Sequence, residues 1–371
     1  MAIPTRNSLI DCLKGLACAT IVWHHLAYYG PMSDVAHPVL PGLLDWLYNY
    51  GRMAVQVFLV LGGYLAAASL APSGLMGLVQ AGPGSPLPRI GRRFVRLVGP
   101  YAAALIVTIV ISAFVRPWFR HDSVSADPDL WQLLAHALLL HGVAGQESLS
   151  AGVWYVAIDF QLYALTTLLF GAAHALAAWR QGRSGATRPW AGASAVAQAM
   201  VVAGVAASVY GFNLDLAWEN WAVYFFGAYG LGMMAYWAVE ADRHSTALGW
   251  CLLIAALVAT ALALQWRDRL ALAGLTALLL VAVMRTPPLR EWGGLAPLRA
   301  LGRISYSAFL IHFSVCLLVN AVVAHYWPCS VPAALVGMAS AFALSMGAGW
   351  LLYLAVERQP PVSFSEDDCT S

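Results

Sequence analysis

The chain has 371 residues, of which 60% are hydrophobic and 10% are charged, and its formal net charge is +2. A soluble domain carries roughly 25% charged residues because its surface faces water, so this composition excludes a soluble globule and predicts an integral membrane protein. The sequence has no basic block long enough for a nucleic-acid patch, so we expect no nucleic-acid partner. None of the six cysteines belongs to a CxxC pair, so we expect neither a metal site nor a disulfide framework.

A transmembrane helix needs about 20 mostly apolar residues, and the sequence predicts ten such spans. They lie near residues 9–29, 52–71, 97–115, 153–178, 191–211, 220–239, 247–266, 270–285, 303–325 and 333–356. The apolar stretch 130–141 is too short to cross a membrane, so we predict a short interfacial or re-entrant helix there. The fold class is therefore an all-α polytopic membrane helix bundle. We expect one transmembrane domain over residues 1–360 and a polar cytoplasmic tail over 361–371.

The basic residues predict the orientation of these spans. If both termini are cytoplasmic, 15 of the 20 lysines and arginines fall in inner segments and five fall outside. This asymmetry is the one that the positive-inside rule expects. A full span at 130–141 would move the arginines of 180–188 outside and weaken the asymmetry. Asp11 and Lys14 interrupt the first apolar stretch, which indicates an uncleaved first span rather than a signal peptide.

Polar groups inside a membrane are expensive, so they are candidates for function. At 100° per residue, Asp11, Lys14 and His25 fall on nearly one face of the first span. His24 points about 100° away from that face, and we interpret it as an interfacial packing residue. His25 shares its face with Lys14, the only lysine in the chain, and is the favoured functional histidine.

Two later spans also carry polar stripes. Asp159 and Tyr163 align on one stripe of the span that begins at 153, and Ser305 and His312 share a face of the span that begins at 303. A single intramembrane histidine often serves only helix packing. Two histidines and an aspartate that enter one bundle favour a functional cluster instead.

Four arginines lie within eight residues before the third span, at positions 89, 92, 93 and 96. Such a group can simply anchor the helix on the cytoplasmic side. It can equally form a phosphate-binding surface, because guanidinium groups pair bidentately with phosphate. Sequence alone leaves both interpretations open.

Several of these stretches resemble motifs of the acyltransferase-3 family of bacterial ten-helix membrane acyltransferases. SLIDCLKGLACATIVWHHL is similar to the family's first-helix motif of a basic residue followed by a histidine, with Asp11 as the preceding acid. RRFVRLVGPY is similar to its RR-x-x-R motif, matched by Arg92, Arg93 and Arg96. AVQVFLVLGGYLAA resembles its FF-x-x-SGF motif, with Gly62 at the usual serine position.

The second half of the chain carries further similarity to the same family. VWYVAIDFQLYAL resembles the W-S-x-x-x-E-x-x-x-Y motif through Trp154, Asp159 and Tyr163, with aspartate where glutamate is commoner. LGRISYSAFLIHF resembles the G-x-x-SY-x-x-YL-x-H motif and carries Ser305 and His312. VERQP is near the terminal E-R-P. The resemblance extends from the first helix to residue 360.

The resemblance implies O-acyl transfer, commonly of acetyl, from cytoplasmic acyl-CoA to a carbohydrate or lipid-linked acceptor outside a bacterial inner membrane. Acyl-CoA is then a donor substrate, and no permanently bound cofactor is expected. The expected partners are membrane lipids, acyl-CoA and the acceptor, and homo-oligomerisation is left open. The main alternative is a transporter or exporter of a small polar or glycan-related molecule; the sequence shows no inverted repeat and no Gly/Pro-broken pair of spans, which are the usual signals of a transporter.

The expected roles follow from the chemistry of each side chain. His25 is the candidate base or acyl carrier, because imidazole exchanges protons near neutral pH. Lys14 would stabilise developing negative charge, Asp159 would orient a histidine or the acceptor, and His312 would handle a second proton or support the structure. The arginines at 92, 93 and 96 would hold CoA phosphates. The expected substrate contacts are Asp11, Trp154, Tyr163 and Ser305.

Overall fold

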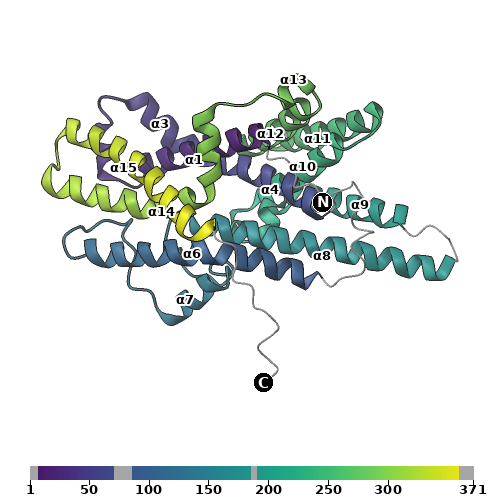
Figure 1. The fold of residues 1–371 in the computed structure, drawn as a ribbon, viewed down its shortest axis with the longest axis horizontal. Helices are drawn as coiled ribbons and strands as arrows, with labels where there is room; N and C mark the ends of the chain where they lie inside the picture. The colour runs from purple at the N-terminus through teal and green to yellow at the C-terminus, as the bar shows by residue number, and fades with distance from the viewer. Residues whose placement is uncertain (1–6, 71–85, 185–189, 359–371) are drawn as a thin grey trace.

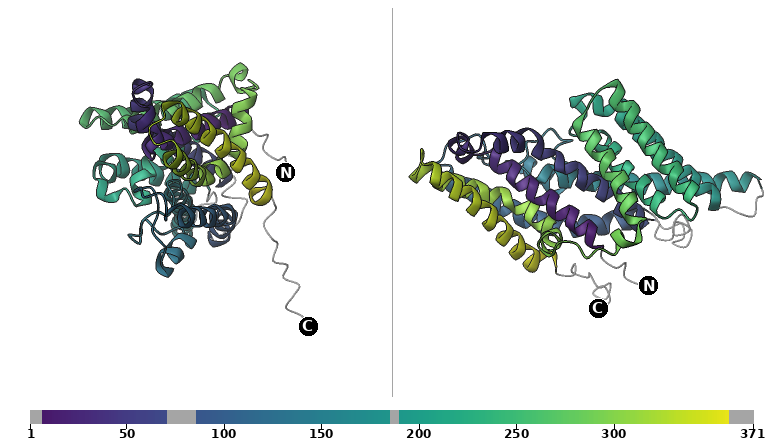
Figure 2. Two further views of the ribbon diagram at one scale, coloured as in Figure 1. Left: turned by 90° about the vertical axis from the view of Figure 1, so that its left-hand side faces the viewer. Right: turned by 90° about the horizontal axis from the view of Figure 1, so that it is seen from above.

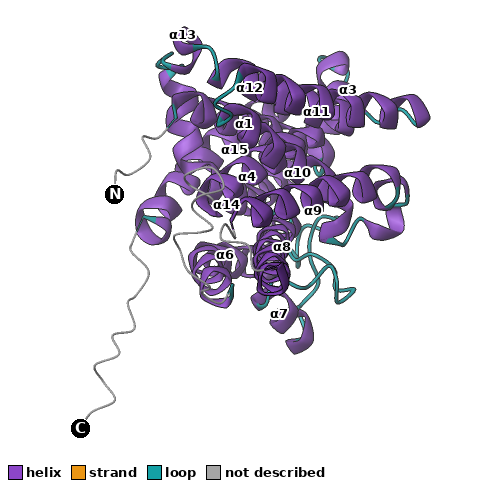
Figure 3. Ribbon diagram, turned by 90° about the vertical axis from the view of Figure 1, so that its right-hand side faces the viewer, coloured by secondary structure: helices purple, strands orange, loops and turns teal. Residues whose placement is uncertain are grey.

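The structure is a computed structural model that describes residues 7–70, 86–184 and 190–358. The described residues form helices and connecting loops, without β-strands (Figure 3). The helices of the first half are α1 (Ser8–Tyr28), α2 (Pro31–Ala36), α3 (Pro41–Tyr50), η1 (Gly51–Ala54), α4 (Val55–Leu70), α6 (Leu87–Val115), α7 (Leu130–Ala137) and α8 (Val153–Ser184). Those of the second half are α9 (Trp190–Tyr210), η2 (Phe212–Leu214), η3 (Leu216–Trp218), α10 (Ala222–Val239), α11 (His244–Leu264), α12 (Asp268–Met284), α13 (Pro287–Arg290), α14 (Ala296–Tyr326), α15 (Val331–Leu352) and η4 (Tyr353–Glu357). The polar tail expected over 361–371 lies outside the described residues.

Eight helical segments in the described part of the chain are long and apolar enough to cross a membrane. They are Pro41–Leu70, Leu87–Val115, Val153–Arg180, Ser194–Leu214, Ala222–Val239, His244–Leu264, Ala296–Tyr326 and Val331–Glu357. The chain is therefore a multi-pass membrane protein built as an all-α helix bundle, as predicted. These eight segments correspond to eight of the ten predicted spans.

The other two predicted spans are α1 and α12, which form as helices but miss the criteria of length or apolarity. α12 has 17 residues, and α1 carries Asp11, Lys14 and two histidines. Packing explains why α1 tolerates them. It lies between α14 and the η1–α4 segment, and Val22 and Leu26 are fully buried. A helix shielded from lipid by its neighbours needs less apolar surface than one on the periphery.

α1 and α14 pack in parallel at very close range. Asp11, Cys18 and His25 of α1 contact α14 at Gly302, Ser305 and His312 in the same order. Glycines permit the approach: a Cβ at Gly15 would collide with the Leu298 carbonyl, and one at Gly302 with the Asp11 carbonyl. Small residues at helix contacts let backbones approach closely within a membrane, and here they bring two histidine-bearing helices together.

The remaining helices surround this pair. α15 packs along α14 on one flank of the molecule, whereas α11 and α12 pack on α10 on the opposite flank (Figures 1 and 2). α4 joins the two groups, because it contacts α1, α10 and α12. α6 and α8 lie side by side along another face, with α7 on the periphery (Figure 1).

The stretch predicted as a short, non-crossing helix is confirmed as α7, which has eight residues. It ends where Leu139 adopts a left-handed conformation with φ +57°, and Gln161 Nε2 donates to the Leu139 carbonyl at 3.0 Å. The chain then turns into the bundle, so that Gly152 lies directly against the Phe309 backbone of α14. Consequently α8 begins deep inside the protein rather than at its surface.

The first and last described helices both contact α14 near the same end of the bundle. Asp11 lies against Gly302, and Ser307 Oγ, a turn further along α14, donates to Glu357 Oε2 of η4 at 2.6 Å. We call this the proximal end, and the opposite end, where α1 terminates at Tyr28, the distal end. Residues near both ends of the described chain thus lie at the same end of the bundle.

Candidate active site

His25 of α1 and His312 of α14 form a buried hydrogen-bonded pair. His25 Nδ1 lies 2.6 Å from His312 Nε2, and the two rings are nearly parallel, at 4°. His25 is 7% exposed and His312 is fully buried. The structure therefore unites the two histidines that the sequence singled out in separate spans. The close α1–α14 packing described above holds them together.

The hydrogen bonds around the pair define which nitrogen carries each proton. His312 Nδ1 lies 2.7 Å from the Phe309 carbonyl oxygen, which can only accept, so His312 Nδ1 carries a hydrogen. In a neutral ring, His312 Nε2 is then the acceptor, and His25 Nδ1 must be the donor. His25 Nε2 is left with an available lone pair, and no described residue hydrogen-bonds to it. The arrangement orients one imidazole nitrogen as a base.

Aromatic side chains enclose the histidine pair. The ring of Tyr29 lies 5.4 Å from that of His25, and the ring of Phe309 lies 5.9 Å from that of His312. Phe309 in turn contacts Tyr155 of α8 at 5.4 Å. Neither Tyr29 nor Phe309 was among the predicted site residues. Both were detectable in principle, because Tyr29 follows His25 by four residues and Phe309 precedes His312 by three, which places each on the face of its histidine.

Asp159 pairs with Arg93 rather than with a histidine. Arg93 Nη2 lies 2.6 Å from Asp159 Oδ2, and the two side chains are 31% and 10% exposed, respectively. The Arg93 guanidinium also lies over the Tyr163 ring, 5.3 Å from its centroid, which adds a cation–π contact. Asp159 and Tyr163, which the sequence aligned on one stripe, therefore share a cluster with Arg93, an arginine that the family resemblance assigned to phosphate binding.

The remaining predicted residues lie apart from the histidine pair. Lys14 precedes His25 by eleven residues of continuous helix, or roughly 16 Å, so the two do not meet. Asp11 and Ser305 belong to the proximal α1–α14 contact, where Ser305 Oγ donates to the Gly302 carbonyl at 3.0 Å. Trp154 packs on Phe225 of α10 at 5.6 Å. Arg92 and Arg96 are exposed on α6.

His24 has a structural role that separates it from its neighbour. Its Nδ1 lies 2.8 Å from the Leu47 carbonyl of α3, and Gly51 packs directly on its Cβ. His24 therefore fastens the α3–η1 segment onto α1. This contact agrees with the helical geometry that pointed His24 away from the face of His25.

A cavity of about 560 Å³ opens at the distal end beside the histidine pair. Its walls are two loop segments, residues 122–126 and 145–151, together with Gln132, Tyr29 and Phe313. Tyr29 contacts His25, and Phe313 follows His312 in the sequence, so the cavity and the pair share a wall. Sequence analysis missed these loops, because they contain neither an apolar run nor a motif.

Two further histidines lie behind this cavity. His136 and His141 stack with their centroids 4.1 Å apart, and His136 Nε2 accepts from the Leu149 backbone at 3.2 Å. Burial lowers the pKa of His136, and burial together with the neighbouring His136 lowers the pKa of His141 to about 3. Both rings are consequently neutral at physiological pH and add no positive charge to the cavity wall.

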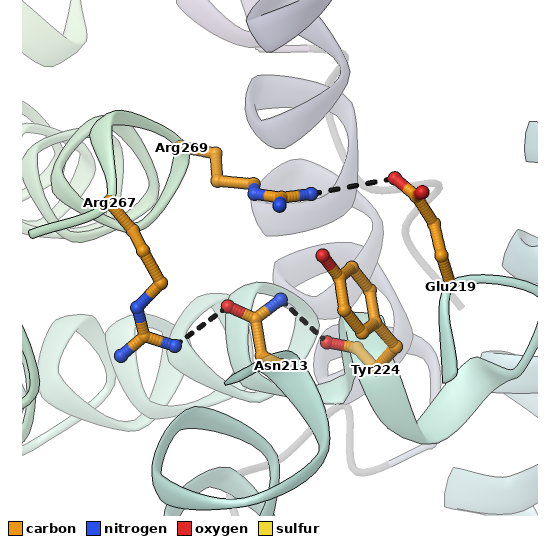
Figure 4. Close-up of polar contacts among 5 residues, drawn as sticks. All are labelled: Asn213, Glu219, Tyr224, Arg267 and Arg269. Carbon is orange, nitrogen blue, oxygen red and sulfur yellow. Dashed lines mark hydrogen bonds and ion pairs between the residues drawn. The ribbon is translucent and has the colours of Figure 1, made fainter. Parts of the chain in front are cut away.

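A separate polar cluster, which includes Asn213, Arg267 and Arg269, lies between α9, α10 and α12 (Figure 4). Arg267 donates to Asn213 Oδ1 and to the Val209 carbonyl, both at 2.9 Å. It thereby caps the last turn of α9, where a cation is favoured by the helix dipole, although burial and the charge of Arg269 lower its pKa. Arg269 lies 3.5 Å from Glu219. We assign this cluster to packing.

Comparison with known proteins decides the class of the chain. The sequence profile of the acyltransferase-3 family, an acyltransferase domain, matches residues 7–354. The chain belongs to the acyltransferase-3 family. It is an acyltransferase embedded in a membrane, as the motifs predicted. No curated protein and no solved structure matches the sequence significantly.

The two departures of this acyltransferase from the family motifs contact each other. A Cβ added at Gly62 would lie 3.2 Å from Asp159 Oδ1 and 3.2 Å from the Tyr229 ring. A serine at this position would place its hydroxyl beside the carboxylate. Two neighbouring positions, each occupied by a smaller residue than the motif usually carries, therefore border the Arg93–Asp159 pair together.

Proposed function

We propose that this acyltransferase moves an acyl group, acetyl in the simplest case, from cytoplasmic acyl-CoA to a hydroxyl of an extracytoplasmic or lipid-linked carbohydrate. The proposal places the proximal end in the cytoplasm of a bacterial inner membrane, with both termini there. The observation that carries it is the His25–His312 hydrogen bond, which leaves His25 Nε2 as an oriented base. The distal cavity beside this base supports an acceptor from the outer side.

The acceptor hydroxyl, the thioester and His25 account for every bond and proton in the transfer. The acceptor hydroxyl gives its proton to His25 Nε2 as its oxygen forms an ester bond with the acyl carbon. The C–S bond of the thioester breaks, and the leaving thiolate takes up the proton as free CoA. His312 holds the His25 ring and stabilises the charge that His25 acquires, because His312 Nε2 accepts from His25 Nδ1. General base catalysis of this kind contributes roughly 10²–10⁴-fold.

CoA release by the purified protein in proteoliposomes tests this function. With radiolabelled acetyl-CoA outside vesicles that enclose a mixture of neutral oligosaccharides, we expect free CoA and labelled ester to form in equal amounts. A transporter would move label across the membrane without cleaving the thioester. Movement of intact substrate with no CoA release would contradict the proposed donor and reaction.

Arg92 and Arg96 support donor binding on the proximal side, because both are exposed whereas Arg93 is engaged by Asp159. We expect the double substitution Arg92→Gln/Arg96→Gln to weaken acyl-CoA binding by roughly tenfold or more, since charge-assisted hydrogen bonds to phosphate are lost. Isothermal titration with a non-hydrolysable acyl-CoA analogue measures the change. Arg180→Gln, which removes an exposed charge from α8, is the matched control. Unchanged affinity in the double variant would leave the arginines only an anchoring role.

A further inference from the structure

The distal cavity is lined by hydrogen-bonding side chains and by negative charge. Its two charged lining residues are Asp122 and Glu147, and neither forms an ion pair with any described residue. The nearby Arg116 is paired with Asp127, at 2.5 Å from its Oδ1, and also donates to the Ser125 carbonyl at 2.8 Å. Residues 116–152 contain four carboxylates (122, 127, 129 and 147) and two arginines (116 and 120), so the formal net charge of this segment is −2.

One polar group in the cavity wall lacks a partner. Ser150 is 2% exposed and lines the cavity, yet its hydroxyl makes no hydrogen bond within the described chain. A buried polar group without a partner costs free energy. By contrast, Ser125 Oγ, on the same wall, donates to the Leu149 carbonyl at 3.1 Å. The hydrogen-bonding capacity of the Ser150 hydroxyl at the cavity wall is thus unused within the described chain, whereas the Ser125 hydroxyl is committed to the fold.

The side of the cavity toward the histidine pair is aromatic. The rings of Tyr29 and Phe313 meet edge to face, with centroids 5.3 Å apart, and Tyr29 also contacts His25. Aromatic faces pack well against the C–H faces of sugar rings, and polar groups opposite them fix orientation. The volume of about 560 Å³ falls within the range of roughly 300–1,000 Å³ typical of small-molecule sites.

We propose that this cavity is the acceptor site and that it selects a polyhydroxyl acceptor without negative charge. The proposal rests on the acyl-transfer function above and specifies its substrate class. Asp122 and Glu147 accept hydrogen bonds from acceptor hydroxyls and repel carboxylate or phosphate groups. Ser150 contributes a further hydrogen bond, and the Tyr29 ring packs against the sugar and positions it beside His25 Nε2.

A matched pair of probes tests this selectivity: maltotriose, and maltotriose whose primary hydroxyls have been oxidised to carboxylates. We expect kcat/KM with acetyl-CoA to be about tenfold or more lower for the anionic sugar, since each like-charge contact at close range in water contributes a factor of several. Asp122→Asn/Glu147→Gln should bring the two values within about threefold of each other.

Ser150→Ala should raise KM for maltotriose several-fold while acetyl-CoA affinity is unchanged. Asp45→Asn/Glu219→Gln, which neutralises two carboxylates outside the cavity, should keep the wild-type ratio.

Binding of the same two sugars, measured by isothermal titration without donor, separates this inference from the proposed function. Preferential binding of maltotriose that depends on Asp122 and Glu147 supports the site even if no acyl transfer occurs, in which case the proposed reaction fails alone. Equal binding of both sugars, binding of neither, or a ratio that the Asp122→Asn/Glu147→Gln variant leaves unchanged would each overturn the assignment of this cavity.

Discussion

Replacing His25 with alanine is expected to lower acyl transfer by roughly 10²–10⁴-fold, and by more if His25 carries the acyl group itself. The reason is geometric. His25 Nε2 is the one nitrogen of the buried pair that the hydrogen bonds to His312 and to the Phe309 carbonyl leave available as a base. Initial rates of CoA release, measured at saturating acetyl-CoA, give the loss.

The neighbouring histidine provides the matched control. His24→Ala removes a side chain of the same kind one residue away, but its contact is with the Leu47 carbonyl of α3, so we expect most of the activity to remain. His312→Ala should lose less activity than His25→Ala, because it releases the orientation of His25 without removing the base. Thermal unfolding of each detergent-solubilised variant checks the fold. A well-folded His25→Ala protein with near-wild-type rates would remove His25 from the mechanism.

Helix geometry predicted the face of α1 on which each histidine lies, but it did not predict which residues surround it. Counting 100° per residue separated His25 from His24 correctly, because α1 is a continuous helix and its faces follow from spacing alone. It also grouped Lys14 with His25, although three turns along one face amount to roughly 16 Å. Residues that share a helix face point in the same direction, but they can lie at different levels along the helix axis. The pairing of His25 with His312 depends on the glycines that bring α1 and α14 together, and no local pattern encodes that contact.

The position of Asp159 shows that the sequence did not predict how deep α8 lies in the bundle. Its span was predicted to start at 153 and α8 does start there, but helix periodicity carries no information on how deep that start lies. The structure buries the start of α8, because the loop after α7 enters the bundle and Gly152 rests on Phe309. Asp159 consequently reaches Arg93, which the sequence placed at the inner surface. Hydropathy finds helices well, but it does not report how far each is shifted along the bundle.

Breaking the Arg93–Asp159 pair is expected to destabilise the protein by several kcal/mol. Removing one partner of a buried ion pair typically costs about 3–5 kcal/mol, because the other charge is left uncompensated. Since the Arg93 side chain keeps 31% exposure, we expect values near the lower end for Asp159→Ala and for Arg93→Ala. Reversible unfolding in mixed detergent micelles measures each change in the free energy of unfolding.

The double variant distinguishes a coupled pair from two independent contacts. If the charges compensate each other, Arg93→Ala/Asp159→Ala should lose less stability than the sum of the single losses, because no unpaired charge remains. Arg116→Ala and Asp127→Ala are the matched control, since Asp127 is 82% exposed and a surface ion pair contributes only about 0–1 kcal/mol. Strict additivity at 93 and 159 would show that the two side chains act separately. In that case the cation–π contact of Arg93 with Tyr163, rather than the ion pair, would be what fastens α6 to α8.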